Sequence, residues 1–214
     1  PIMLRDPDGR KIDPTSETEW NDQKQAIMNR KASIDSEINR LTSKAERKGW
    51  SEAKLNGRIG DLGERSSSLG QTLNTMQELE DCQKNTYKLR KVDKAGNFSL
   101  GKGDDAGKLI ITYSSTASFV HEVTHGGQFH NKEVGLFGNG VFCAYDLTDE
   151  VRAYKAAFAY DPSYCGEDIY SSSQITTDWV RNLQDEKGEY PYSRLSAGPI
   201  NDNRLFKPDR RRKQ

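Results

Sequence analysis

The sequence predicts an α+β protein in which a long antiparallel helical hairpin precedes a small sheet and further helices. Between residues 15 and 82, apolar residues recur three, four and seven positions apart, which is the spacing of one helical face. From about residue 85 the pattern changes to short runs of β-branched and aromatic residues separated by turn-forming residues. Helical spacing then returns in the last hundred residues.

The hairpin is predicted from two apolar stripes. Ser16 and Glu19 fit a capping box that opens the first helix. Its stripe consists of Ile27, Ile34, Ile38, Leu41 and Ala45. After a break at residues 48–50, Ser51 is a candidate N-cap for the second helix. The second stripe consists of Leu55, Ile59, Leu62, Leu69, Leu73 and Met76. Two such helices joined by a short turn bury their stripes against each other.

Glycines interrupt the second stripe, and each costs about 1 kcal/mol relative to alanine in a helix interior. They either permit close contact between helices or mark a break in the helix. The glycines concerned are Gly57, Gly60, Gly63 and Gly70.

The rest of the chain predicts strands over 86–92, 97–100 and 108–113, followed by a helix that contains the histidines. Ser115 or Thr116 can cap that helix, and Gly126-Gly127 is expected to end it. Later helices are expected over 147–160 and about 176–186. We thus divide the chain into a linker (1–14), the hairpin (15–82), a sheet-containing domain (83–200) and a basic tail (201–214).

Composition limits the class of protein. The formal net charge is zero, so nothing favours broad attraction to nucleic acid. No apolar run of about 18 residues occurs, so no membrane span is expected, and the first residues lack the apolar core of a signal peptide. The three cysteines, Cys82, Cys143 and Cys165, are widely spaced, which favours a reducing compartment, with a single Cys143–Cys165 bridge as the alternative.

All three histidines lie in the segment HEVTHGGQFH, residues 121–130. On a helix, His121 and His125 share one face roughly 6 Å apart and can bind one tetrahedral zinc ion. Glu122 lies about 100° further round the helix, which places its carboxylate beside the metal without binding it. A bound zinc lowers the pKa of water toward about 7, and Glu122 can then accept the proton as general base. The segment therefore predicts a catalytic zinc site.

A catalytic zinc normally has three protein ligands, so a third must come from elsewhere. His130 is one residue short of the spacing HExxHxxGxxH, because Gln128 and Asn131 stand where that pattern needs glycine and histidine. Glu150, about 25 residues downstream on a predicted helix, is the preferred third ligand. Asp149, Asp146 and His130 are the alternatives, although either aspartate could instead be an acidic residue at a helix N-terminus.

The segment HEVTH with a downstream glutamate on a helix resembles the gluzincin branch of zinc metallopeptidases. The resemblance implies a zincin-like fold, with a small sheet over an active-site helix and a second helix that brings Glu150 to the metal. Gluzincins often carry an aspartate four residues after that glutamate, where this chain has Tyr154. Tyr154, Tyr145 and Tyr160 are candidates to help stabilise the oxyanion.

At the other end, Pro1, Asp6, Pro7 and Gly9 match the PxxxxDPxG signature that closes the Rhs-repeat core of polymorphic toxins. With the peptidase-like motif, the chain resembles the metallopeptidase toxin domains found behind Rhs cores. The resemblance implies cleavage from a parent Rhs core, delivery by a specialised secretion system, a protein substrate in the target-cell cytoplasm and a cognate immunity protein.

The sequence thus predicts a zinc metallopeptidase toxin with His121, His125 and Glu150 as ligands and Glu122 as base. Two alternatives use the same residues differently. One is a non-catalytic binding module, built on the helical hairpin, with structural zinc or none. The other is a zinc amidase or deamidase. A nucleic-acid deaminase is disfavoured, because no PCxxC accompanies the histidines.

Overall fold

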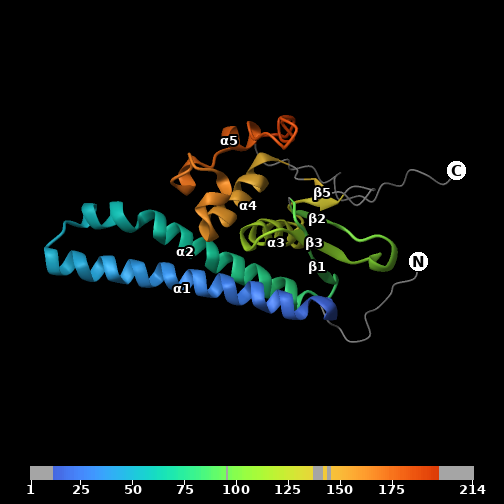
Figure 1. Ribbon diagram of the computed structural model, residues 1–214, viewed down its shortest axis with the longest axis horizontal. Coiled ribbons are helices and arrows are strands. Elements are labelled where there is room, and N and C mark those ends of the chain that lie inside the picture. Colours follow the sequence, from blue (N-terminus) through green and yellow to red (C-terminus); the bar gives the residue numbers. More distant parts are fainter. Residues whose placement is uncertain (1–11, 95, 137–141, 144–145, 198–214) are drawn as a thin grey trace.

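The computed structural model describes residues 12–94, 96–136, 142–143 and 146–197 and has a mixed α+β architecture. Figure 1 shows its elements in order: α1 (Glu17–Lys48), α2 (Glu52–Asp81), β1 (Tyr87–Lys91), β2 (Asn97–Leu100), β3 (Leu109–Tyr113), α3 (Thr116–His130), β4 (Gly135–Leu136), β5 (Phe142–Cys143), α4 (Leu147–Tyr160) and α5 (Thr177–Arg181). The predicted strands and the helix over 147–160 are confirmed. The last helix is shorter than predicted.

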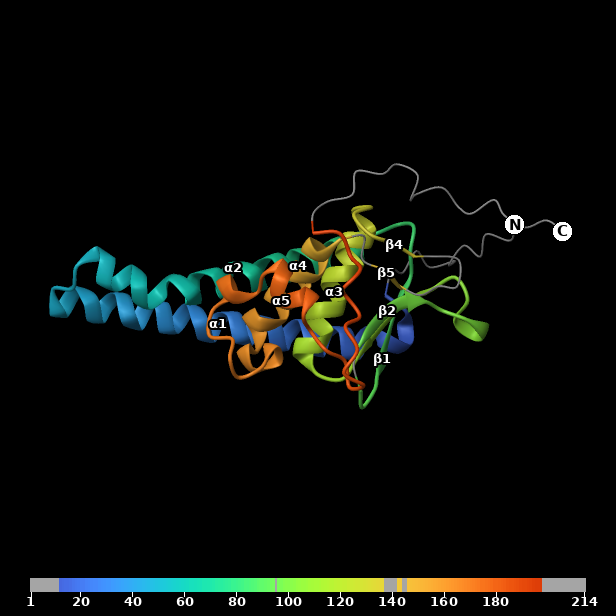
Figure 2. The same cartoon turned by 90° about the horizontal axis from the view of Figure 1, so that it is seen from above.

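Helices α1 and α2 form the predicted antiparallel hairpin, whose far end projects beyond the rest of the molecule (Figures 1 and 2). Gly49 ends α1 in the left-handed conformation, with φ of 59°, and the Ser51 hydroxyl caps α2 by accepting from the Lys54 N–H at 3.3 Å. The predicted capping box is wrong. The Ser16 hydroxyl accepts from the Leu89 N–H at 3.0 Å, and the Glu19 carboxylate accepts from the Tyr113 hydroxyl. Both side chains therefore bind the sheet and do not cap α1.

The sheet has the strand order β1-β3-β2, with β1 parallel and β2 antiparallel to the central strand β3. Strand β3 is buried along most of its length and leads directly into α3. Of the two candidate caps, Ser115 holds the start of α3 by accepting from the Ser118 N–H at 3.2 Å. The short turn after β3 therefore sets where the histidine helix begins relative to the sheet.

One hydrophobic core joins the hairpin to the sheet and to α3. Trp20 and Ile27 of α1 and Leu69, Met76 and Leu79 of α2 are buried in the same cluster as the sheet. Helix α3 contributes Phe119, Val120 and Val123. The division of the chain at residue 82 stays a prediction, but the inner halves of α1 and α2 cover apolar surface that the sheet and α3 would otherwise expose to water.

The pair Gly126-Gly127 does not end α3, which continues to His130, so that expectation is wrong. A Cβ at Gly127 would lie 2.5 Å from Thr75 Cγ2, and one at Gly126 would lie 3.2 Å from Leu79 Cδ1. These two glycines therefore allow α2 to approach α3 closely. In α2, by contrast, an added Cβ at Gly57, Gly60 or Gly63 meets nothing within 4 Å, so those glycines neither break the helix nor permit a close contact.

Two arginines of the hairpin hold the C-terminal end of α4. Arg30 Nε donates to the Tyr160 carbonyl at 2.8 Å, and Arg65 Nε donates to the Ala159 carbonyl at 3.2 Å. These carbonyls lie at the end of a helix, where backbone acceptors lack partners within the helix and the helix dipole favours cations. The hairpin thus fixes the position of α4, which carries Glu150 in its first turn.

A second, smaller cluster lies on α4 and the segments that follow it, and it contains Phe158, Cys165, Ile169 and Ile175. Cys165 is a free thiol, so the alternative of a Cys143–Cys165 bridge is not formed. Among the described residues, no helix combines the length and the apolar character that crossing a membrane requires. The PxxxxDPxG motif, Tyr145 and the basic tail lie outside the described residues.

Candidate metal centre

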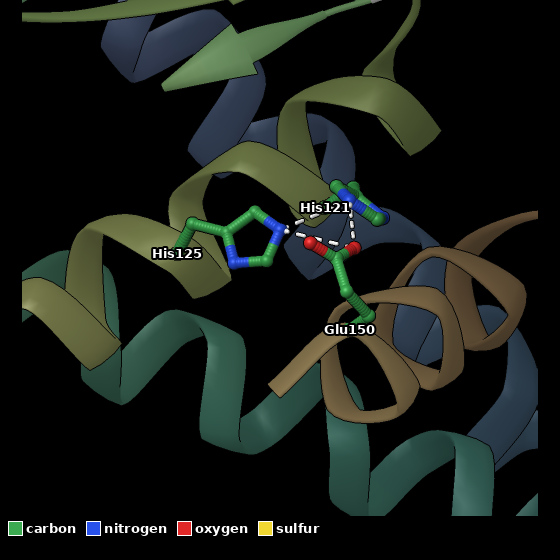
Figure 3. A group of neighbouring side chains, drawn as sticks. All are labelled: His121, His125 and Glu150. Atoms are coloured by element: carbon green, nitrogen blue, oxygen red, sulfur yellow. Dashed lines mark hydrogen bonds and ion pairs between the residues drawn. The ribbon is translucent and has the colours of Figure 1, made fainter. Parts of the chain in front are cut away.

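Helices α3 and α4 bring His121, His125 and Glu150 together, and Figure 3 shows the three side chains pointing toward one another. The two histidines lie one turn apart on α3, and Glu150 faces them from the first turn of α4. The two Nε2 atoms are 3.1 Å apart, and Glu150 Oε2 is 3.5 Å from each of them. The three residues form a buried group that could hold a metal ion.

The group is buried and strongly polar. Relative exposure is 5% for His121, 2% for His125 and 3% for Glu150. Burial alone would lower the pKa of His125, but the nearby Glu150 carboxylate raises it to about 9. Burial would likewise raise the pKa of Glu150, but the two imidazoles lower it well below its usual range. Glu150 Oε2 faces both rings, and its contacts with the two imidazole nitrogens are long, at 3.5 Å each. A buried carboxylate is costly unless a cation or a proton binds it closely.

Glu122 lies beside this group, anchored to the edge of the sheet. The Phe98 backbone of β2 hydrogen-bonds the Glu122 carboxyl, and a Cβ at Gly96 would lie 2.9 Å from Glu122 Cγ. Only glycine at position 96 leaves room for this approach, because the same Cβ would lie 2.6 Å from the Thr112 carbonyl oxygen. Burial is the main reason that the pKa of Glu122 is raised. A raised pKa moves a carboxylate toward the range that suits a general base at neutral pH.

The rival third ligands have other contacts. Asp146 is the N-cap of α4 and accepts from the Thr148 N–H at 2.6 Å. The Asp149 carboxylate forms an ion pair with Arg152 at 2.7 Å. His130 is the last residue of α3. Among the described residues, the group that could hold a metal contains none of the three, and Glu150 alone joins the histidines.

Sequence reasoning missed Gln128. Its Oε1 lies 2.7 Å from His125 Nδ1, and its Nε2 donates to the Asp149 carbonyl at 2.9 Å. Gln128 follows His125 by three residues, so helical spacing places the two on one face, and this spacing was the signal available in the sequence.

Two tyrosine rings lie near His121, and a third tyrosine contacts one of them. The Tyr154 ring packs edge-on against the His121 ring with 4.6 Å between centroids, and the Tyr164 ring is 6.1 Å away. The hydroxyls of Tyr154 and Tyr192 lie 3.4 Å apart. Burial raises the pKa of Tyr154 to about 12, so its hydroxyl stays protonated at neutral pH. Of the tyrosines proposed as helpers, Tyr154 reaches the group, whereas Tyr160 packs against the main core.

A groove of about 620 Å³, lined mainly by polar residues, lies between α2, α3 and α4. Gln128 forms part of its wall, but none of the three metal-group residues lines it. The groove therefore does not give direct access to the candidate metal centre.

A scan of family models and searches of curated proteins and solved structures find no match to this chain. The function is therefore inferred from the chemistry of the site.

Proposed function

We propose that this chain is a zinc-dependent metallopeptidase in which His121, His125 and Glu150 hold the zinc and Glu122 is the general base. The observation that carries the proposal is the convergence of three buried donor atoms of the right types from two helices. Imidazole nitrogen suits zinc and neighbouring transition metals better than it suits magnesium or calcium. Two histidines and one glutamate form a ligand set known for catalytic zinc.

The spacing of the donors is compatible with a tetrahedral zinc ion. With metal–ligand distances of about 2.0–2.1 Å, two ligands of a tetrahedral zinc lie about 3.3–3.5 Å apart. The three separations in this site are 3.1, 3.5 and 3.5 Å. They fit one face of such a tetrahedron and leave a fourth position for water or substrate. A cation at the centre of this face would neutralise the buried carboxylate of Glu150.

When bound, zinc would supply Lewis-acid polarisation of a peptide carbonyl and a lowered pKa for a water molecule. The protein supplies the proton acceptor. Glu122, held by the Phe98 backbone and raised in pKa by burial, would take a proton from the attacking water and pass it to the leaving amine. Tyr154 remains protonated at neutral pH, so it can donate a hydrogen bond to the oxyanion.

Burial of the ligands favours a second candidate, a structural metal in a non-catalytic module. Structural zinc sites are closed, whereas a catalytic site must admit its substrate. Here Glu122 is only 6% exposed, and the three metal-group residues are buried as well. Peptidase activity therefore requires the site to open when a polypeptide binds.

The proposed role in the cell rests on the PxxxxDPxG motif of residues 1–9. Its resemblance to the end of Rhs cores supports a toxin that is released from a parent Rhs protein, delivered by a specialised secretion system and active on a protein in a recipient's cytoplasm. A cognate immunity protein would bind the toxin in the producing cell.

The test compares the wild-type chain with Glu122→Gln, which removes the base and keeps all three ligands. We expect about one zinc per chain in both proteins, with growth arrest and newly created protein N-termini only in cells that express the wild type. Zinc in both proteins with equal toxicity would refute the peptidase mechanism. Zinc in both, with no cleavage by either and loss of folding on zinc removal, would favour the structural metal.

A further inference from the structure

Gln128 occupies a position between the two ligand-bearing helices. It lies on α3 and is 3% exposed. One end of its amide contacts the ring of His125, and the other contacts the Asp149 carbonyl on α4, next to Glu150 in the chain. One side chain thus touches a ligand of one helix and the peptide beside a ligand of the other.

The identity of these partners fixes which way the amide points. A backbone carbonyl can only accept a hydrogen bond, so the NH₂ end of Gln128 must face Asp149. The carbonyl end, Oε1, then faces His125 Nδ1 at 2.7 Å. Since Oε1 can only accept, Nδ1 must carry the proton that is shared between them. His125 Nε2 is then the nitrogen whose lone pair is available to a metal, and this is the atom that faces His121 and Glu150.

An ionised carboxylate could not replace this amide. At position 128 it could accept from Nδ1, but its second oxygen would face the Asp149 carbonyl, with no proton between two acceptors. The amide satisfies both partners because one end accepts and the other donates. Metal-binding histidines depend on such a contact on their second nitrogen to fix the ring and its tautomer.

We propose that Gln128 is the positioning residue of this site. It selects the Nδ1-protonated tautomer of His125 and ties the histidine helix α3 to the first turn of α4, which carries Glu150. The role rests on the proposed zinc site.

The first test measures zinc affinity by chelator competition in Gln128→Met and Gln128→Glu. Methionine keeps a similar shape without hydrogen bonds, and glutamate keeps the acceptor but loses the donor. Both should weaken zinc binding about ten- to a hundredfold and alter the visible spectrum of the cobalt-substituted protein. Asn131→Ala, an exposed position at the end of α3, is the matched control and should bind zinc like the wild type.

Wild-type affinity in Gln128→Glu would refute the need for a donor toward Asp149. Wild-type affinity and an unchanged cobalt spectrum in Gln128→Met would refute the whole role, while leaving the zinc site intact. A wild-type chain that binds no zinc would overturn both this role and the proposed function.

A second measurement needs no variant. Long-range proton–nitrogen correlation NMR of the zinc-bound wild type reports which His125 nitrogen carries the proton. We expect a protonated Nδ1 and a metal-bound Nε2. The opposite assignment would overturn the proposal even if the variants failed to fold.

Discussion

The same substitution, glycine to alanine, should have opposite effects on stability in two helices of this protein. At Gly60, in α2, an added Cβ would meet nothing within 4 Å. At Gly127, in α3, it would lie 2.5 Å from Cγ2 of Thr75 on α2, closer than two carbon atoms can approach without displacement. A comparison of the two substitutions therefore measures the cost of crowding the contact between α2 and α3.

Both substitutions gain about 1 kcal/mol from the better helix propensity of alanine. Gly60→Ala should keep that gain and raise the free energy of unfolding by about 1 kcal/mol. Gly127→Ala must also move Thr75, a β-branched residue with a stiff side chain, or separate the two helices. Overpacking of this kind costs roughly 1–3 kcal/mol. We therefore expect Gly127→Ala to be less stable than Gly60→Ala by about 1–3 kcal/mol, with the difference arising from the contact alone.

Urea unfolding of the metal-free proteins measures both effects as shifts of the midpoint at constant slope. Thr75→Ser removes Cγ2, so most of the loss should disappear in the Gly127→Ala/Thr75→Ser double variant. If Gly127→Ala stabilised the protein as much as Gly60→Ala, the close approach of α2 to α3 would be wrong.

Two further predictions concern acid stability and the hairpin. Burial alone would raise the pKa of Asp13, but hydrogen bonds from Lys108 and Thr15 lower it to about 2. Ionised Asp13 therefore stabilises the folded state. This stabilisation is fully present above pH about 4 and is lost as pH falls through 2. Asp13→Asn should therefore lower the free energy of unfolding by on the order of 1–2 kcal/mol at pH 7. If the difference in this free energy between wild type and variant stayed constant down to pH 2, ionisation of Asp13 would not be its cause. A chain beginning at residue 83 should be insoluble and metal-free, because it lacks the buried residues of α1 and α2; a soluble 83–214 chain that binds zinc would show that the hairpin is dispensable.

Local pattern was enough to predict much of the fold and the centre of the site. Periodic apolar residues predicted α1 and α2, and the spacing of His121 and His125 placed both imidazoles on one face. Neighbours on a helix point about 100° apart, so Asp149 and Glu150 were not both expected to face the metal. The longer reach of glutamate and the gluzincin-like spacing favoured Glu150. The structure directs Glu150 to the histidines and Asp149 to Arg152.

The errors and omissions involve contacts between segments far apart in the chain. Ser16 meets all the local requirements of an N-cap, yet its hydroxyl binds Leu89, which is 73 residues away. Gly126-Gly127 has the composition of a helix end, but Thr75 and Leu79 of another helix explain both glycines. No local pattern shows that Tyr192 meets Tyr154 or that Gln128 reaches the Asp149 carbonyl.

The central claim is that Glu150 completes a zinc site with the two histidines, and zinc affinity in matched carboxylate variants tests it most directly. Glu150→Gln keeps the shape of the side chain and removes its charge. Asp149→Asn makes the same change at the neighbouring residue, whose carboxylate pairs with Arg152. We predict about one zinc per wild-type chain, binding at least about tenfold weaker in Glu150→Gln, and near wild-type affinity in Asp149→Asn and His130→Ala. Full affinity in Glu150→Gln, with loss in either of the other two variants, would contradict the account.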